Sequence, residues 1–237
     1  AELGLLGMTT PEEWGGVGLD SVTWALALEE LAAADPSVAV IVSVTSGLPQ
    51  YMLLRFGSEA QKRRYLVPLA RGEWIGAFCL TEPGSGSDAQ AMRTTAVPSE
   101  DGSHYLLNGA KIWISNAGYA GVLTVFAKVP VTIDGVVKQR VTAFIVDAHA
   151  PGISLGKIEE KMGIKGSDTR TITFENVRVP AENLLGEVGG GFKIALEILN
   201  SGRLGLSAGS TRGTREMMKL ALAHAKEREQ FGRAIGS

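Results

Sequence analysis

The sequence is poor in the residues that build disulfide frameworks and metal centres. Its 237 residues contain a single cysteine, Cys79, which excludes an internal disulfide framework and a zinc site made of several cysteines. One cysteine suits a reducing compartment. The three histidines, His104, His149 and His224, are far apart and show no metal-ligand spacing. We therefore expect no metal site.

Strong charge of one sign and long apolar runs are also missing. The 23 basic and 25 acidic residues give a net charge of -2 without a basic stripe, so we expect no nucleic-acid partner. The apolar run 32–48 is interrupted by Asp35 and Pro36, which predicts a buried helix rather than a membrane span. Association with a membrane stays open. The start of the sequence shows no signal-peptide pattern. We expect the chain to be a piece of a longer protein.

What is present divides the chain into three compositional zones. Residues 1–74 are rich in helix formers and carry an S-x-x-Q capping box at Ser58 and Gln61. Residues 75–186 contain short β-branched or aromatic runs between turn signals, which predicts a middle antiparallel β-domain, either a sandwich or a barrel. Residues 187–237 return to helix and predict the start of a helical bundle. The expected fold class is α+β with these three domains.

Glycine positions refine this expectation. Asn108–Gly109 predicts a two-residue hairpin turn between HYLLNG and KIWISN, and Asp134–Gly135 predicts a second turn. In the last zone, two stretches could join as one long helix. Its small residues Gly205, Ala208, Gly209 and Gly213 would allow close packing of another helix, in a bundle or at a subunit interface.

The stretch TEPGSGSDA, residues 81–89, fits the G-x-G-x-x-G/A pattern of dinucleotide-binding folds. That pattern requires a helix directly after the loop, whereas a turn and the strand-like HYLLNG follow here. A P-loop is excluded because no Gly-Lys-Ser/Thr follows. Glycines and hydroxyls in such a loop can hold a polar heterocycle or a phosphate. Taken alone, an ordinary surface turn is the simpler interpretation.

A second stretch, KIWISNAG, points to an aromatic ligand. Strict alternation along a strand would place Trp113 and Ser115 on the same face. An indole beside a hydroxyl can stack on a ring system and hydrogen-bond its edge. A core tryptophan that shares its face with a serine explains the pattern equally well.

Five motifs in this order resemble the acyl-CoA dehydrogenase family, and the resemblance covers essentially the whole chain. LNSGR is most similar to the very-long-chain branch of that family. The resemblance implies a helical N-terminal domain, a middle β-domain and a C-terminal helical bundle, with FAD between the last two. The motifs are TEPGSGSDA, KIWISNAG, KMGIKGSDTRTITFENVRVP, GGGFKIALEILNSGR and EREQFG.

The resemblance implies three groups of FAD-binding residues. Thr81 would bond the edge of the isoalloxazine, Ser115 would reach the N5 region, and Trp113 would flank the ring. A third group would grip the FAD of a neighbouring subunit in a homodimer or homotetramer. The groups are Phe78, Cys79, Leu80, Thr81, Ser85, Gly86 and Ser87; Trp113, Ile114 and Ser115; and Arg228, Gln230 and Phe231.

The implied reaction is α,β-dehydrogenation of an acyl-CoA thioester, with electrons passed to an electron-transferring flavoprotein. The implied substrate contacts are Ser87, Asn200, Ser201, Gly202 and Arg203. The family's usual base is a glutamate that we expect after Ser237, and the alternative position matches Gly202, so no catalytic base is assigned. A flavin oxidase on the same fold and a non-catalytic assembly protein are the alternatives.

Several of these residues also have purely structural interpretations. We expect Cys79 to be a small buried side chain and Glu82 to orient the loop rather than act as a base. Asp168 and Arg170 are expected to form an ion pair that supports a turn. Arg203 could pair with Glu197 along a helix.

Overall fold

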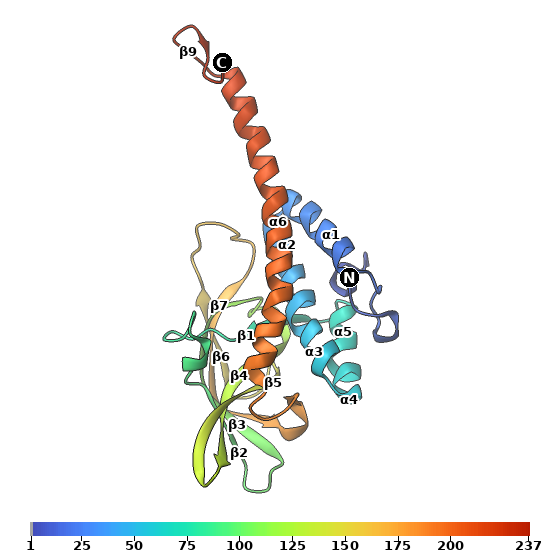
Figure 1. Cartoon of the computed structure of the whole chain (residues 1–237), viewed down its shortest axis with the longest axis vertical. Helices are drawn as coiled ribbons and strands as arrows, with labels where there is room; N and C mark the ends of the chain where they lie inside the picture. Colours follow the sequence, from blue (N-terminus) through green and yellow to red (C-terminus); the bar gives the residue numbers. More distant parts are fainter. Residues whose placement is uncertain (1) are drawn as a thin grey trace.

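The computed structural model describes residues 2–237. A group of helices packs beside a β-sheet, and one long helix runs along both and extends away from them (Figure 1). The helices before the sheet, including short 3-10 and π turns, are η1 (Leu5–Gly7), η2 (Glu12–Trp14), α1 (Ser21–Ala34), α2 (Pro36–Thr45), η3 (Ser46–Gln50), α3 (Tyr51–Phe56), α4 (Glu59–Gln61), η4 (Lys62–Leu66) and α5 (Val67–Ala70).

Side-chain caps set the helix boundaries. The Asp20 carboxylate accepts a hydrogen bond from the backbone N–H of Thr23 at 2.7 Å and so begins α1. Asp35 ends α1 and caps α2, with Pro36 at the first helical position. The predicted buried run 32–48 is therefore two helices rather than one. The capping box of Ser58 and Gln61 forms as predicted.

The segment Pro36–Phe56 is long and apolar enough to cross a membrane by length and composition alone. In the structure it packs against α1, β1 and the long helix α6 (Gly191–Glu227), and more than half of its apolar window is buried. It is thus a core helix of this fold. Its middle turn, η3, is a π turn that contains Pro49, and turns of this kind are frequent at functional sites.

The β-domain is an eight-stranded mixed sheet with the order β6-β7-β3-β2-β4-β5-β8, to which β1 is added through β4. Most neighbours are antiparallel, but β1 and β2 each pair with β4 in parallel. The strands are β1 (Ile75–Cys79), β2 (Thr95–Pro98), β3 (His104–Ser115), β4 (Ala120–Ile133), β5 (Val136–Asp147), β6 (Ile153–Ile158), β7 (Thr169–Pro180) and β8 (Leu184–Leu185), with short helices η5 (Ala89–Ala91) and η6 (Ala181–Asn183).

The predicted hairpin turn at Asn108–Gly109 is wrong. Strand β3 runs without a break from His104 to Ser115, and Gly109 lies at a shift in the pairing register with β7. Its φ of 144° is a conformation for which glycine is needed. The second predicted turn is confirmed, because Asp134 and Gly135 join β4 to β5 with positive φ at both residues.

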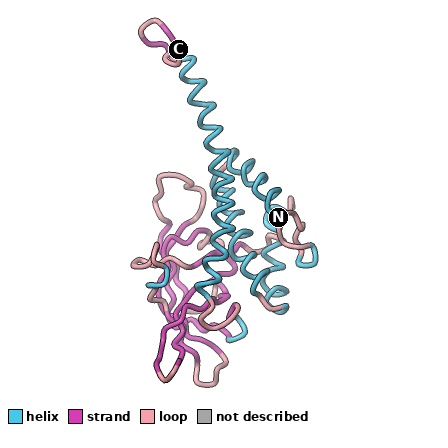
Figure 2. The backbone as a smooth tube through the Cα atoms, viewed as in Figure 1, coloured by secondary structure: helices cyan, strands magenta, loops and turns pink. Residues whose placement is uncertain are grey.

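The last zone forms one 37-residue helix, α6, which confirms that its two helical stretches are continuous. Its first half lies along α1, α2 and the β-domain, and its second half projects away from them (Figure 2). Gly205 allows the close approach to α1 and α2, since a Cβ there would lie 2.7 Å from both Ser43 and Trp24. A small hairpin, β9 (Glu229–Gln230) and β10 (Arg233–Ala234), follows at the far tip.

Candidate functional site

The glycine-rich loop and the KIWISNAG strand meet at the end of β1. The chain leaves β1 at Cys79, and the carbonyl of Thr81 accepts a hydrogen bond from the backbone N–H of Ile112 at 2.9 Å. Thr81 and Trp113 are thereby held on neighbouring backbone segments although they are distant in sequence. The structure thus brings together the first two of the three predicted cofactor-binding groups.

Trp113 does not follow strand alternation. It has a φ of 56° and lies at a shift in the register between β3 and β7. This left-handed residue turns the indole outward, where it is 64% exposed, while Ile114 is buried. Alternation is interrupted between Lys111, which faces the core, and Trp113, whereas the shared face expected for Trp113 and Ser115 stays a prediction. An exposed indole beside the loop is available to stack on a flat ring.

The tip of the loop faces open space. A Cβ added to Gly84 would meet nothing within 4 Å, and at Gly86 it would meet only Thr81 at 3.9 Å. Ser87 is exposed, whereas Ser85 is buried and donates its hydroxyl to the carbonyl of Asp88 at 2.6 Å. The hydroxyl of Ser85 therefore serves the loop itself, as do its backbone N–H and carbonyl, which are bonded to the backbone of Glu82.

The three predicted cofactor residues before Thr81 point into the protein. Phe78 packs edge-on against Phe126, with ring centroids 5.1 Å apart, and Leu80 lies in the same hydrophobic cluster. Cys79 is fully buried, as expected, and burial raises the pKa of its thiol to about 12. Their side chains build the wall beneath the loop.

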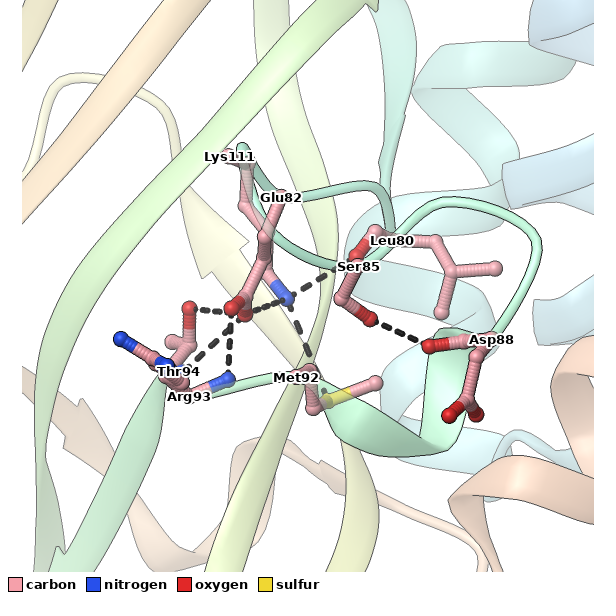
Figure 3. A network of polar contacts seen from close by, with 8 residues as sticks. All are labelled: Leu80, Glu82, Ser85, Asp88, Met92, Arg93, Thr94 and Lys111. Atoms are coloured by element: carbon pink, nitrogen blue, oxygen red, sulfur yellow. Dashed lines mark hydrogen bonds and ion pairs between the residues drawn. The ribbon is translucent and has the colours of Figure 1, made fainter.

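Glu82 is the centre of the polar contacts below the loop (Figure 3). Its buried carboxylate accepts hydrogen bonds from the backbone N–H groups of Arg93 and Thr94 and from the Thr94 hydroxyl, at 2.5, 3.0 and 2.6 Å. It also pairs with the Lys111 ammonium at 2.8 Å. Glu82 thus orients the loop, as the sequence predicted.

Lys111 was not predicted as a functional residue, although a lysine within the otherwise apolar strand KIWIS was a visible signal. Its side chain is fully buried, and Nζ also donates to the carbonyl of Leu80 at 3.1 Å. Burial lowers the pKa of Lys111, an effect that Glu82 opposes. For Glu82, burial favours the neutral acid, but hydrogen bonds from Lys111, Thr94 and Arg93 outweigh it and lower the pKa of the carboxyl.

The second predicted flavin-binding element, KIWISNAG, is anchored by the contacts of Asn116 and of Asp168. Asn116 is buried and donates to Thr45 of α2 at 3.3 Å and to the carbonyl of Gly76 at 3.1 Å. The expected ion pair of Asp168 and Arg170 is confirmed at 2.8 Å, and Asp168 also accepts from the N–H of Gly118. These bonds fix the chain directly after Ser115.

The predicted substrate segment lies on α6, where it crosses the π turn η3. A cavity of about 370 Å³ opens there, bordered by Ser201, Asn200 and Gly47 among other residues. Gly202 faces Leu48, since a Cβ there would lie 3.1 Å from that side chain. The alternative pairing of Arg203 with Glu197 is wrong, because Arg203 donates to Asn200 at 2.7 Å and Glu197 pairs with Arg55.

The third predicted cofactor group lies apart from the other two. Arg228 follows the last residue of α6, and Gln230 and Phe231 belong to the hairpin at its far tip (Figure 1). All three side chains are exposed. Within one chain, this group does not meet the loop or Trp113. Among residues 2–237 no cluster of three histidine, cysteine or acidic side chains is placed to hold a metal ion.

Comparison with protein families agrees with this architecture. Models of the N-terminal, middle and C-terminal domains of acyl-CoA dehydrogenases match residues 1–73, 77–177 and 189–237. The class of protein that combines this mixed helical and β fold with the motifs described above is that of the acyl-CoA dehydrogenase flavoproteins. The chain belongs to the acyl-CoA dehydrogenase family.

Individual relatives cover the chain almost completely. It is 49% identical over 236 residues to the very long-chain specific acyl-CoA dehydrogenase of Bos taurus mitochondria, spanning 99% of this chain and 36% of that protein. An acyl-CoA dehydrogenase of Bacillus anthracis complexed with FAD is 44% identical, with a TM-score of 0.90 over 99% of this chain and 39% of that one.

A chain in the structure of the electron transferring flavoprotein of Acidaminococcus fermentans is 43% identical, with a TM-score of 0.89 over 100% of this chain and 61% of that one. The chain thus spans between about a third and two thirds of the length of the proteins it resembles.

Proposed function

We propose that this chain is part of an FAD-dependent acyl-CoA dehydrogenase that acts on long or very long acyl chains and passes electrons to an electron-transferring flavoprotein. The adjacency of the open glycine loop and the outward-turned Trp113 carries the proposal, together with membership of the family. The likeness to a very long-chain specific relative supports the chain length, and the likeness to a chain in a flavoprotein structure supports the partner.

The residues present fit FAD. An exposed indole offers an apolar plane, and the loop beside it offers the Thr81 hydroxyl, the exposed Ser87 and backbone donors that no Cβ shields at Gly84 and Gly86. Ser115, partly buried on the same strand, adds a further hydroxyl. When bound, FAD supplies the hydride acceptor of the reaction, and these residues hold and orient it.

The other predicted groups fit a larger assembly. We propose that Asn200, Ser201, Gly202 and Arg203 border the acyl-CoA, together with Ser87. Arg228, Gln230 and Phe231 would contact the FAD of a second subunit, because they lie exposed at the far end of α6. An arginine fork suits the pyrophosphate. Binding of one FAD by two subunits implies a homo-oligomer. Each subunit would contain domains at 1–74, 75–186 and 187–237.

Removal of the α proton needs a free carboxylate of raised pKa. Glu82 does not qualify, because four donors saturate its oxygens and lower its pKa. Gly202, at the alternative position for the base, has no side chain. We propose that the base is contributed by residues other than these 237, so that this chain alone does not turn over.

Flavin content tests the proposal. The intact gene product is expected to purify with bound FAD, or to take it up when reconstituted, and to show the visible flavin spectrum. Replacing Trp113→Ala removes the stacking plane and is expected to weaken FAD binding about tenfold. A matched change at Trp74→Ala, an exposed tryptophan at the other end of β1, should leave FAD affinity unchanged. An intact protein that binds no flavin would contradict the proposed function.

A further inference from the structure

The loop between β1 and β2 is closed at two places by one residue. The backbone of Glu82 exchanges hydrogen bonds with that of Ser85, at 2.9 and 3.1 Å, which closes the loop tip. Its carboxylate accepts from the backbone of Arg93 and Thr94, which closes the loop where it enters β2. Residues 82–94 therefore form a ring that Glu82 fastens on both sides (Figure 3).

Met92, near the end of this loop, is buried in the core, but most of the loop tip is not held by packing. A Cβ added to Gly84 would meet nothing within 4 Å, and one added to Gly86 would meet only Thr81 at 3.9 Å. The residues Pro83, Gly84 and Gly86 to Asp88 are exposed. The hydrogen bonds made by Glu82, with the bond from the Ser85 hydroxyl to the carbonyl of Asp88, thus restrain where the tip lies, since glycine itself allows many backbone conformations.

Lys111 connects this ring to the KIWISNAG segment of β3, which carries Trp113. Its ammonium donates to Glu82 at 2.8 Å and to the carbonyl of Leu80 at 3.1 Å, from a position on β3 two residues before Trp113. Both charged groups are buried, so neither can be released to water without leaving the other unpaired. One backbone bond, from Ile112 to Thr81, runs alongside the ion pair.

From this geometry we propose that Glu82 and Lys111 are positioning residues that hold the glycine loop and Trp113 at a fixed spacing, so that FAD affinity depends on their ion pair. Neither residue is assigned a contact with FAD. The inference rests on the proposed function, because it concerns the same cofactor. The buried ion pair beneath the site, and not the exposed loop alone, sets how the glycine loop and Trp113 lie relative to each other.

Three variants of the intact protein separate positioning from stability. Glu82→Gln places an amide N–H₂ among donors and leaves Lys111 as a buried unpaired charge, so both stability and FAD affinity fall. Lys111→Met removes one donor, and the carboxylate keeps Thr94 and Arg93. The double variant has no unpaired charge, so the thermal stability of the apoprotein partly recovers relative to Glu82→Gln, while FAD affinity does not.

Binding is measured by titrating each folded apoprotein with FAD and following the quenching of flavin fluorescence, with the visible spectrum as a second readout. We expect the dissociation constant to rise on the order of tenfold in Glu82→Gln and in the double variant. The control is Phe144→Leu, a fully buried residue that packs against Tyr105 and does not touch the loop. It should lower thermal stability and leave the FAD dissociation constant and spectrum unchanged.

Thr94→Val is a milder probe if the charge variants fail to fold. It deletes only the hydroxyl that donates to Glu82 at 2.6 Å and should still raise the dissociation constant measurably more than Phe144→Leu. Dissociation constants within about twofold of wild type in all folded variants would overturn the inference while leaving the proposed function intact. If the wild-type protein itself binds no FAD, the proposed function fails first.

Discussion

At the scale of single residues, Gly109 shows how one position fixes a strand that contributes to the site. A Cβ there would lie 2.6 Å from the Thr94 hydroxyl and 2.7 Å from the Thr94 Cα, with φ at 144°. Gly109→Ala is therefore expected to destabilise the fold by about 3 kcal/mol through overpacking and backbone strain, measured by urea unfolding.

Gly84→Ala is the matched control for that change, because its added methyl group meets nothing within 4 Å. It should change the free energy of unfolding by less than about 0.5 kcal/mol. Equal effects of the two substitutions would contradict the described close approach of β3 to Thr94.

Glu82 also predicts a dependence of stability on pH. Its pKa in the folded state is lowered from the ordinary value of 4.5, so the folded state favours the ionised carboxylate more than the unfolded state does. The stabilisation is present above pH 4.5 and is lost as pH falls through the folded pKa. Glu82→Gln lacks this titration. The difference in unfolding free energy between wild type and Glu82→Gln should therefore shrink as pH falls below 4.5. A constant difference would show that Glu82 does not titrate with folding.

At the scale of elements, the packing of α6 on α1 and α2 depends on a small residue. Gly205→Ala places a methyl group 2.7 Å from Ser43 and Trp24 and should destabilise the chain by about 1–2 kcal/mol. Gly213→Ala on the same helix meets nothing within 4 Å and should stabilise it by up to about 1 kcal/mol through helix propensity. Thermal unfolding of the 237-residue chain measures both, and effects of the same sign would contradict this helix crossing.

Elements also show what the sequence could predict. Helix caps are local, so the boundary at Ser58 followed from a few neighbouring residues. The order and parallel pairing of β1 and β2 with β4 arise from contacts between distant segments, which no local pattern encodes. The hairpin predicted at Asn108–Gly109 failed because the same glycine that suits a turn also suits a shift of register within a long strand.

The candidate site, too, has parts that the sequence predicted and parts that it could not predict. Motifs located the loop and Trp113, but the outward turn of the indole needed a left-handed residue that alternation does not predict. Lys111 escaped notice because a lone lysine on a strand is ordinarily solvated, and its partner lies on a different strand connection. Buried charge pairs are visible only once the segments are brought together.

At the scale of the whole molecule, the projecting half of α6 exposes large apolar side chains, namely Met217, Met218, Leu220 and Leu222. Exposed apolar surface of this extent is typical of a face that another segment or subunit covers. We expect the 237-residue chain on its own to self-associate and to bind FAD more weakly than the intact protein. Analytical ultracentrifugation and FAD titration of both measure this. Equal FAD affinity of a monomeric 237-residue chain would contradict the contribution proposed for a second subunit.

The central claim, an acyl-CoA dehydrogenase half-reaction, is tested most directly by anaerobic titration of the intact, FAD-loaded protein with palmitoyl-CoA and with butyryl-CoA. The measured quantity is the absorbance of oxidised flavin. The account predicts bleaching by palmitoyl-CoA and little or none by butyryl-CoA. Bleaching by butyryl-CoA alone would keep the reaction and contradict the long-chain substrate. Full flavin occupancy with no bleaching by either thioester would contradict the claim itself.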